Sequence, residues 1–175
     1  MDSPLSDALC LFLLIVALMA NAYFAQIDTA LTASHRGRLE RLAESGEAGA
    51  TEALALLEHA DRPIAMAQAG VTCMSLFTGL GIGLFALPIF SGMLTRLLPG
   101  MEIYAAALVL SILVMTTLTL LFGDFLPKQI ALQNPEEMLL RKHRAIALLT
   151  QLTALPSTAL ISISRGILLI FGINP

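Results

Sequence analysis

The chain has 175 residues, of which 57% are hydrophobic and only 13% carry a charge, and its mean hydropathy is +0.80. Soluble domains have about 25% charged residues, so this composition excludes an ordinary soluble fold. The net charge of −3 excludes the basic surface that nucleic-acid binding requires. Cys10 and Cys73 lie in apolar stretches and predict neither a disulfide framework nor a metal-binding pair. The sequence therefore predicts an all-α integral membrane protein whose main partner is the lipid bilayer.

Three apolar runs are long enough to cross a membrane, since a spanning helix needs about 20 mostly apolar residues. No charged residue lies between Asp7 and Asp28, which predicts a first span over 8–27. This run lacks the basic start of a secretory signal and is longer than the apolar part of one, so we interpret it as a true span. A second span is predicted over 63–84, followed by a short re-entrant or interfacial segment, and a third over 103–123.

Basic residues indicate the orientation, because lysine and arginine accumulate on the cytoplasmic side of a membrane. Arg96 is alone between the second and third predicted spans, whereas eight of the ten basic residues flank the opposite ends: Arg36, Arg38, Arg41, Arg62, Lys128, Arg141, Lys142 and Arg144. The N-terminus is therefore predicted outside the plasma (cell inner) membrane, with a helical hairpin over 34–61 and the C-terminus in the cytoplasm. The run 145–164 either spans the bilayer or belongs to juxtamembrane helices over 135–173, and its polar residues favour the second interpretation.

Two carboxylates end predicted spans and are candidates for function. Asp28 closes the first span and Asp124 closes the third. Ionisable groups inside a membrane cost roughly 2.5–3.5 kcal/mol on insertion scales and are functional candidates by default. The predicted orientation places both toward the cytoplasmic half, where they can face each other. Carboxylates with nearby hydroxyl and carbonyl oxygens suit Mg²⁺ or Ca²⁺ better than softer metals.

Pro127 adds a helix break beside the second of these acids. Because proline has no N–H, the carbonyl of Gly123 loses its helical hydrogen-bond donor. A carbonyl freed at membrane depth must meet water, protein or an ion. Broken helices recur at the substrate sites of transporters. The alternative is an ordinary helix end that carries an interfacial pair of Asp124 and Lys128.

The second predicted span has a polar stripe on one helical face. Gln68, Thr72, Ser75 and Gly79 recur at spacings of four, three and four residues. Such a stripe either holds helices together or lines an ion path. Asn21, on the first span, is interpreted as a helix–helix hydrogen bond. No catalytic triad, P-loop or HExxH motif is present, so we expect no enzyme activity.

Several short motifs together resemble one known family. They are YFAQIDTAL over 23–31, HADRP over 59–63, QAG over 68–70, GDFLPK over 123–128 and NPE over 134–136. In this order they resemble the transmembrane domain of the CNNM/CorC magnesium-transporter family, and the last two motifs are the most specific. The similarity extends over nearly the whole chain.

The resemblance implies a homodimeric domain of three transmembrane helices with juxtamembrane helices. It implies transport of Mg²⁺, which several family members carry out as Na⁺-linked efflux. Carried onto this sequence, the family's ion site comprises Asp28, Thr72, Ser75, Gly123 and Asp124. Family members usually continue into a pair of CBS domains, so a cytoplasmic CBS-type partner domain is expected if the chain is truncated.

Two departures from the family pattern support alternatives. Ala25 and Ile27 stand where the family has small hydroxyl residues, and both acids are aspartate where glutamate is usual. Fewer oxygen ligands with two carboxylates would suit a polyamine or another organic cation, so a polyamine exporter is one alternative. The other is a membrane anchor that dimerises a regulatory domain and transports nothing.

Overall fold

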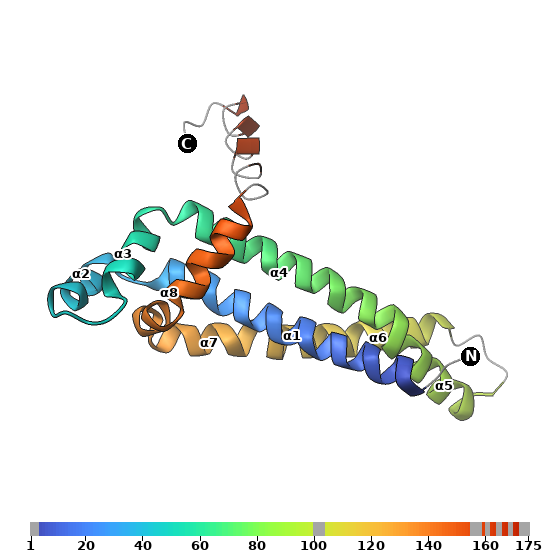
Figure 1. Ribbon diagram of the computed structural model, residues 1–175. Coiled ribbons are helices and arrows are strands. Elements are labelled where there is room, and N and C mark those ends of the chain that lie inside the picture. Colours follow the sequence, from blue (N-terminus) through green and yellow to red (C-terminus); the bar gives the residue numbers. More distant parts are fainter. Residues whose placement is uncertain are drawn as a thin grey trace. The chain divides into compact units, whose positions relative to one another are not determined.

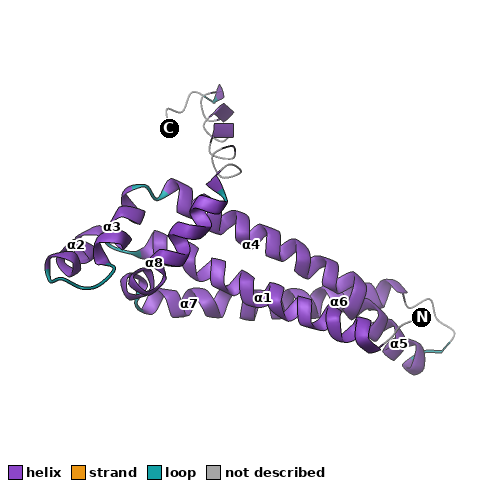
Figure 2. Ribbon diagram, viewed as in Figure 1, coloured by secondary structure: helices purple, strands orange, loops and turns teal. Residues whose placement is uncertain are grey.

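The computed structural model describes residues 4–99 and 104–154, together with 159, 162–163, 166–167 and 170–171. Every regular element within these residues is a helix, as Figure 2 shows. In chain order (Figure 1) the elements are α1 (Pro4–Ala33), α2 (Arg36–Glu44), α3 (Ala50–Glu58), α4 (Asp61–Gly81), η1 (Ile82–Ala86), α5 (Leu87–Leu97), α6 (Tyr104–Leu118), η2 (Thr119–Phe125), α7 (Leu126–Gln133) and α8 (Pro135–Leu152). The predicted all-α fold is confirmed.

Three helical stretches are long and apolar enough to cross a membrane. They are Ala8–Ala33 in α1, Asp61–Leu97 through α4, η1 and α5, and Tyr104–Gln133 through α6, η2 and α7. The first and third are longer than predicted because the helix continues past Asp28 and Asp124, and the second is longer because η1 and α5 continue the helix beyond residue 84. The chain is therefore a multi-pass membrane protein with three candidate spans, and the limits of each span in the bilayer stay predictions.

The chain forms two compact units, of which the first comprises Met1–Tyr23 and Val71–Pro127. In this unit α5 packs against α6, and the π-helical segment η1 contacts both. A Cβ atom at Gly81 would lie 2.7 Å from Leu14 Cδ1, so glycine allows α1 and α4 to approach closely here. Residues 87–97, which the sequence assigned to a re-entrant or interfacial segment, form helix α5. Their depth in the bilayer stays a prediction.

Two buried hydroxyls of the first unit bond within their own helices. Ser111 Oγ donates to the carbonyl of Ala107 across 2.6 Å, and Thr78 Oγ1 donates to the carbonyl of Met74 across 3.0 Å. Because each bonds one turn back, neither hydroxyl requires a partner on another helix. Large apolar side chains cover much of the outer surface, as lipid contact requires; they include Phe12, Leu76, Leu113 and Phe122.

The second unit comprises Phe24–Gly70 and Lys128–Pro175. Helix α2 packs against α3, and α3 packs against α8 (Figure 1). The core of this unit includes Leu39, Leu139 and Ile146, whose side chains are fully buried or nearly so. Burying each of these side chains contributes roughly 1.5–3 kcal/mol, so the apolar faces hold the helices together.

A glycine-containing turn connects α2 to α3. Gly46 and Gly49 have φ angles of 80° and 84°, in the left-handed region that favours glycine. A Cβ atom at Gly49 would also lie 2.7 Å from Cε1 of His143 on α8. Glycine is therefore needed at this position both for the turn and for the approach of α8.

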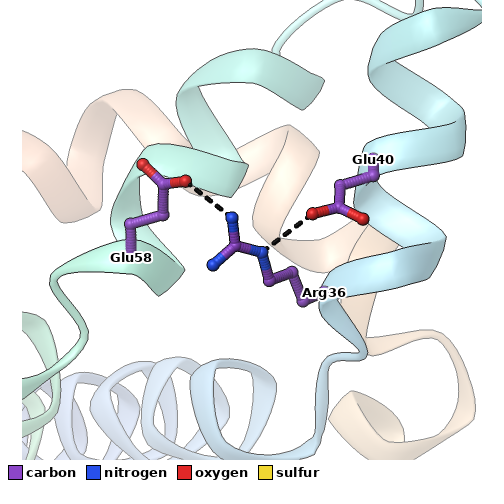
Figure 3. Close-up of polar contacts among 3 residues, drawn as sticks. All are labelled: Arg36, Glu40 and Glu58. Carbon is purple, nitrogen blue, oxygen red and sulfur yellow. Dashed lines mark hydrogen bonds and ion pairs between the residues drawn. The ribbon is translucent and has the colours of Figure 1, made fainter.

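Salt bridges connect the outer faces of α2 and α3 (Figure 3). Arg36 Nε lies 2.8 Å from Glu40 Oε1, and Arg36 Nη2 lies 3.0 Å from Glu58 Oε1. All three side chains are largely exposed, and exposed ion pairs contribute about 0–1 kcal/mol each. The buried faces therefore stabilise the α2–α3 pair more than these charges do.

The predicted juxtamembrane region is described in part. Residues 135–152 form helix α8, which carries Glu136 and Glu137 in its first turn. Most of the run from 153 to 173 lies outside the described residues. Whether residues 145–164 span the membrane therefore stays a prediction.

Candidate functional site

A buried hydrogen bond joins α1 to the π-helical segment η2 within the first unit. Asn21 Nδ2 donates to the carbonyl oxygen of Gly123 across 3.0 Å, and Asn21 is only 1% exposed. This carbonyl is the one that Pro127 deprives of its ordinary helical donor. The predicted helix–helix hydrogen bond of Asn21 is thus confirmed, and its acceptor is the carbonyl that the helix break releases.

The segment η2 places Gly123 where α1 can reach it. At the end of η2 the N–H of Leu126 bonds to the carbonyl of Leu121, five residues back, which is the wide spacing of a π-helix. A Cβ atom at position 123 would lie 2.8 Å from Asn21 Nδ2 and 2.9 Å from Leu18 Cδ1. Only glycine therefore fits the observed contact without displacement of α1. π-Helical segments inside α-helices often occur at functional sites.

The oxygen of the Asn21 amide, Oδ1, is the atom of this pair that could bind a ligand. A carbonyl can only accept, so the amide must present Nδ2 to Gly123, which leaves Oδ1 as an acceptor. Oδ1 is buried and has no hydrogen-bond partner among the described residues. A buried amide oxygen of this kind calls for a water molecule or a cation. Asp124, next in the chain after Gly123, is half-buried in the same unit.

The predicted hydroxyl ligands of α4 lie elsewhere on the unit. Thr72 and Ser75 are exposed on the surface of the single chain, as is Gly79 on the same stripe. Thr78, three residues beyond Ser75, is the buried hydroxyl of this helix and was not predicted as a site residue. The structure therefore brings Asn21 into contact with Gly123, and Asp124 and Pro127 lie close to Gly123 in the sequence. The α4 stripe, by contrast, is exposed.

Asp28 belongs to the second unit, whereas Asp124 belongs to the first. The Asp28 side chain is half-buried on α1 beside Ile27, which is fully buried. Thr32 Oγ1 donates to the Asp28 backbone carbonyl across 2.9 Å and so stays engaged with its own helix. The prediction that the two aspartates face each other stays a prediction.

Carboxylate, imidazole and thiol groups do not form a metal centre in the described part of the chain. No group of three or more His, Cys, Asp or Glu residues among the described residues is placed to hold a metal ion. The oxygen atoms near Asn21 are its own amide oxygen, the Gly123 carbonyl and, next in the chain, the Asp124 carboxylate. Such oxygen ligands suit a hard, largely hydrated ion.

The second unit contains a buried acid that sequence reasoning missed. Glu136 is 2% exposed, and its Oε1 accepts the backbone N–H of His35 across 3.1 Å. Its Oε2 lies 3.5 Å from Arg38 Nη1. Glu136 therefore connects the start of α8 to the start of α2. The NPE motif was the only sequence signal at this position.

A second unpredicted contact joins α8 to α1 in this unit. Lys142 Nζ donates to Gln26 Oε1 across 2.6 Å. Partial burial lowers the pKa of Lys142, because desolvation disfavours the charged ammonium group. Lys142 thus holds α8 against α1, and Glu136 holds α8 against the start of α2.

Comparison with known proteins reveals similar chains in several bacteria. The chain is 32% identical over 94% of its length to a UPF0053 protein of Synechocystis, and covers 37% of that protein. It is 32% identical over 71% of its length to the polyamine export protein of Haemophilus influenzae, and covers 29% of it. A UPF0053 protein of Bacillus subtilis is 27% identical over 77% of the chain, which covers 29% of that relative. The chain thus spans about a third of the length of these relatives.

A family model describes almost the entire chain. The CNNM model, the Cyclin M transmembrane N-terminal domain, matches residues 12–175. The match includes most of the first candidate span, all of the other two, the α2–α3 pair and helix α8. The resemblance inferred from the GDFLPK and NPE motifs is therefore confirmed, and the chain belongs to the CNNM family of Cyclin M transmembrane N-terminal domains.

Proposed function

We propose that this chain is the membrane domain of a cation transporter and that its principal substrate is Mg²⁺. The buried Oδ1 atom of Asn21 is the observation that carries the proposal, because it is an oxygen ligand without a hydrogen-bond partner among the described residues. The Nδ2 atom of the same amide group donates a hydrogen bond to the Gly123 carbonyl. Family membership supports a transport role.

The chemistry of these groups suits a hard divalent ion. Asn21 supplies an amide oxygen, Gly123 a backbone carbonyl and Asp124 a carboxylate. Mg²⁺ usually keeps several water molecules and binds through one or two carboxylates. A site with a single nearby carboxylate and neutral oxygens would hold a partly hydrated ion without the tight binding that prevents release. In this proposal Pro127 keeps the Gly123 carbonyl outside the ordinary helical ladder.

The remaining predicted ligands fit a homodimer. Three spans seldom enclose a water-filled path, so we propose that two copies form the transport unit. Thr72 and Ser75 are exposed on the single chain, and hydroxyls on a spanning helix commonly bond across a helix–helix interface. In the proposal these two residues face the ion path or the second copy, and Asp28 supplies a second acid along that path.

The proposed direction is efflux coupled to Na⁺. In this proposal the N-terminus lies outside the plasma (cell inner) membrane and helices α2, α3 and α8 lie in the cytoplasm, an orientation that the distribution of basic residues supports. The chain covers only 37% and 29% of the relatives from Synechocystis and Haemophilus influenzae, which leaves room for a cytoplasmic CBS-type domain in the whole protein.

A polyamine is the second candidate substrate. The relative from Haemophilus influenzae is named a polyamine export protein, and this chain covers 29% of it. Ala25 and Ile27, which precede Asp28 in the sequence, are fully buried and offer no side-chain oxygen. Asp28 and Asp124 would then each bind an ammonium group of the substrate. A non-transporting membrane anchor is the remaining alternative, and it requires no ligand.

Ligand-dependent stability distinguishes these three functions. The purified chain in detergent is unfolded by heat with Mg²⁺, Ca²⁺, Na⁺ or putrescine added separately. A ligand that binds only the folded state stabilises it by about 2.7 kcal/mol at a hundredfold excess over Kd. We expect stabilisation by Mg²⁺ that is lost in Asp124→Asn and retained in Glu44→Gln, which changes an exposed carboxylate on α2. Stabilisation by putrescine alone would favour a polyamine, and none by any ligand would favour the anchor.

A further inference from the structure

The second unit has a cavity of about 520 Å³ that includes none of the candidate ion-site residues. Helix α3, the beginning of α4 and the middle of α8 surround it. Its described lining residues are Glu52, Ala55, Leu56, His59, Arg62, Pro63, His143, Arg144, Ala147, Thr150 and Gln151. The cavity therefore has an apolar wall with a polar rim, which is typical of ligand sites.

Positive charge predominates in this lining. Arg62 and Arg144 approach the cavity from α4 and α8, and His59 and His143 add two imidazole groups. Glu52 is the acidic residue that the described lining contains. Arginine presents a planar fork of N–H groups that matches phosphate oxygens, so two arginines at one cavity favour a phosphate ligand.

The lining also includes the imidazole of His143 and the side chain of Thr150. His143 Nδ1 lies 2.6 Å from the carbonyl oxygen of Leu140, and since a carbonyl only accepts, Nδ1 carries the proton. The imidazole is therefore held in one tautomer, with Nε2 as its second polar atom. Thr150 Oγ1 is buried and has no hydrogen-bond partner among the described residues.

The cavity adjoins the start of a candidate membrane span. Arg62 and Pro63 belong to the first turn of α4, where the candidate span Asp61–Leu97 begins. Phospholipid headgroups occupy this level, and basic residues near the ends of spans attract anionic lipids. Leu56, Pro63 and Ala147 give the wall an apolar part that a soluble phosphate would not require.

We propose that this cavity binds the phosphate-bearing headgroup of an anionic membrane phospholipid. Arg62 and Arg144 bind the phosphate, and the apolar wall contacts the glycerol and the first acyl carbons. The same phosphate chemistry would suit a soluble phosphate, but the cavity's level at the start of a span favours lipid as the source. The proposal is independent of what the protein transports.

Native mass spectrometry of the chain in detergent tests this site. The protein is titrated with phosphatidylglycerol or with phosphatidylcholine of the same acyl chains, and the bound fraction gives an apparent affinity for each. We expect phosphatidylglycerol to bind more tightly. A basic residue near a membrane surface contributes about 1 kcal/mol to the binding of anionic lipid, which is about fivefold in affinity, so Arg62→Gln with Arg144→Gln should weaken binding about 25-fold.

Control variants distinguish binding in this cavity from nonspecific attraction of anionic lipid to exposed arginines. Arg41→Gln with Arg96→Gln removes two exposed arginines outside the cavity and should leave binding unchanged. The charge-preserving pair Arg62→Lys and Arg144→Lys should retain most of the preference for phosphatidylglycerol. Should the glutamine pair fail to fold, the preference of the wild-type protein for phosphatidylglycerol, and its weakening about fivefold in Arg62→Gln or Arg144→Gln alone, still test the site.

Three results would overturn the proposal. The first is equal affinity for the two lipids in the wild-type protein. The second is equal loss of phosphatidylglycerol binding in the cavity pair and the control pair. The third is complete displacement of the lipid by inorganic phosphate at the concentration that the lipid itself needs, which would make soluble phosphate the ligand.

Discussion

Asn21 and Gly123, which are 102 positions apart in the sequence, are joined by a hydrogen bond of 3.0 Å between a side-chain amide and a backbone carbonyl. Proline at position 127 removes the helical donor of that carbonyl, and the asparagine of another helix supplies a replacement. The bond therefore compensates for the helix break, and the amide oxygen of Asn21 stays buried without a hydrogen-bond partner among the described residues.

Replacing Asn21 with leucine should destabilise the first unit. The substitution keeps a similar side-chain volume but leaves the buried Gly123 carbonyl without the Asn21 donor. Hydrogen bonds between helices in membranes contribute about 0.6–2 kcal/mol, so we expect a loss of about 1–2 kcal/mol in the free energy of unfolding. Denaturation of the purified protein in detergent measures this. Thr117→Ala, which removes an exposed hydroxyl bonded within its own helix, is the control, and an equal effect would contradict the role of Asn21.

Gly123→Ala should destabilise the protein through steric overlap. The added Cβ would lie 2.8 Å from Asn21 Nδ2 and 2.9 Å from Leu18 Cδ1, so α1 must move away. Overpacking of this kind costs about 1–3 kcal/mol. Gly79→Ala is the control, because a Cβ there meets nothing within 4 Å and alanine favours a helix over glycine by about 1 kcal/mol. If the two variants had the same thermal stability, the close approach at Gly123 would be wrong.

The buried acid on α8 allows a graded substitution series. Glu136→Ala removes the acceptor of the His35 N–H and the partner of Arg38, and a hydrogen bond to a charged group contributes about 1.5–3 kcal/mol. Glu136→Gln keeps an oxygen for the His35 N–H and should cost less. The neighbouring Glu137→Ala removes an exposed pair with Arg141 and should cost less than about 0.5 kcal/mol. Equal losses for alanine at 136 and 137 would argue against the buried contact.

The lowered pKa of Lys142 predicts a pH dependence of stability. In the folded protein this pKa lies below its ordinary value of 10.5, so between the two values the unfolded chain binds more protons. The free energy of unfolding should therefore rise as the pH increases through that window toward 10.5. The wild-type protein is compared with Lys142→Gln across this alkaline range. The stability difference between them should shift in favour of the wild type, and a constant or opposite difference would show that Lys142 is not desolvated.

Local patterns in the sequence predicted the features that depend on neighbouring residues. Runs without charge predicted three helices that can span a membrane, because lipid excludes charge whatever the packing. Pro127 predicted a released carbonyl at Gly123, because the loss of its donor is a matter of covalent structure. That Asn21 is the partner could not be predicted, since it depends on how α1 meets η2.

Burial of individual polar residues was harder to predict. Glu136 and Glu137 are adjacent acids in the first turn of α8, yet one is 2% exposed and the other is exposed. Which of two such acids is buried depends on the rotation of the helix against α2. The stripe through Thr72 and Ser75 shows the same difficulty on α4, where the buried hydroxyl is instead Thr78. Periodicity identifies a face, but the neighbouring helices decide whether that face is buried.

Flux of Mg²⁺ from proteoliposomes tests the central claim most directly. The purified chain is reconstituted into vesicles loaded with Mg²⁺, and release is followed with an external fluorescent indicator in parallel with release of putrescine. We predict Mg²⁺ release above that of protein-free vesicles, abolished by Asp124→Asn, strongly reduced by Asn21→Leu and unchanged by Glu44→Gln. No release by the wild-type protein, or equal release by wild type and Asp124→Asn, would contradict the proposed Mg²⁺ path.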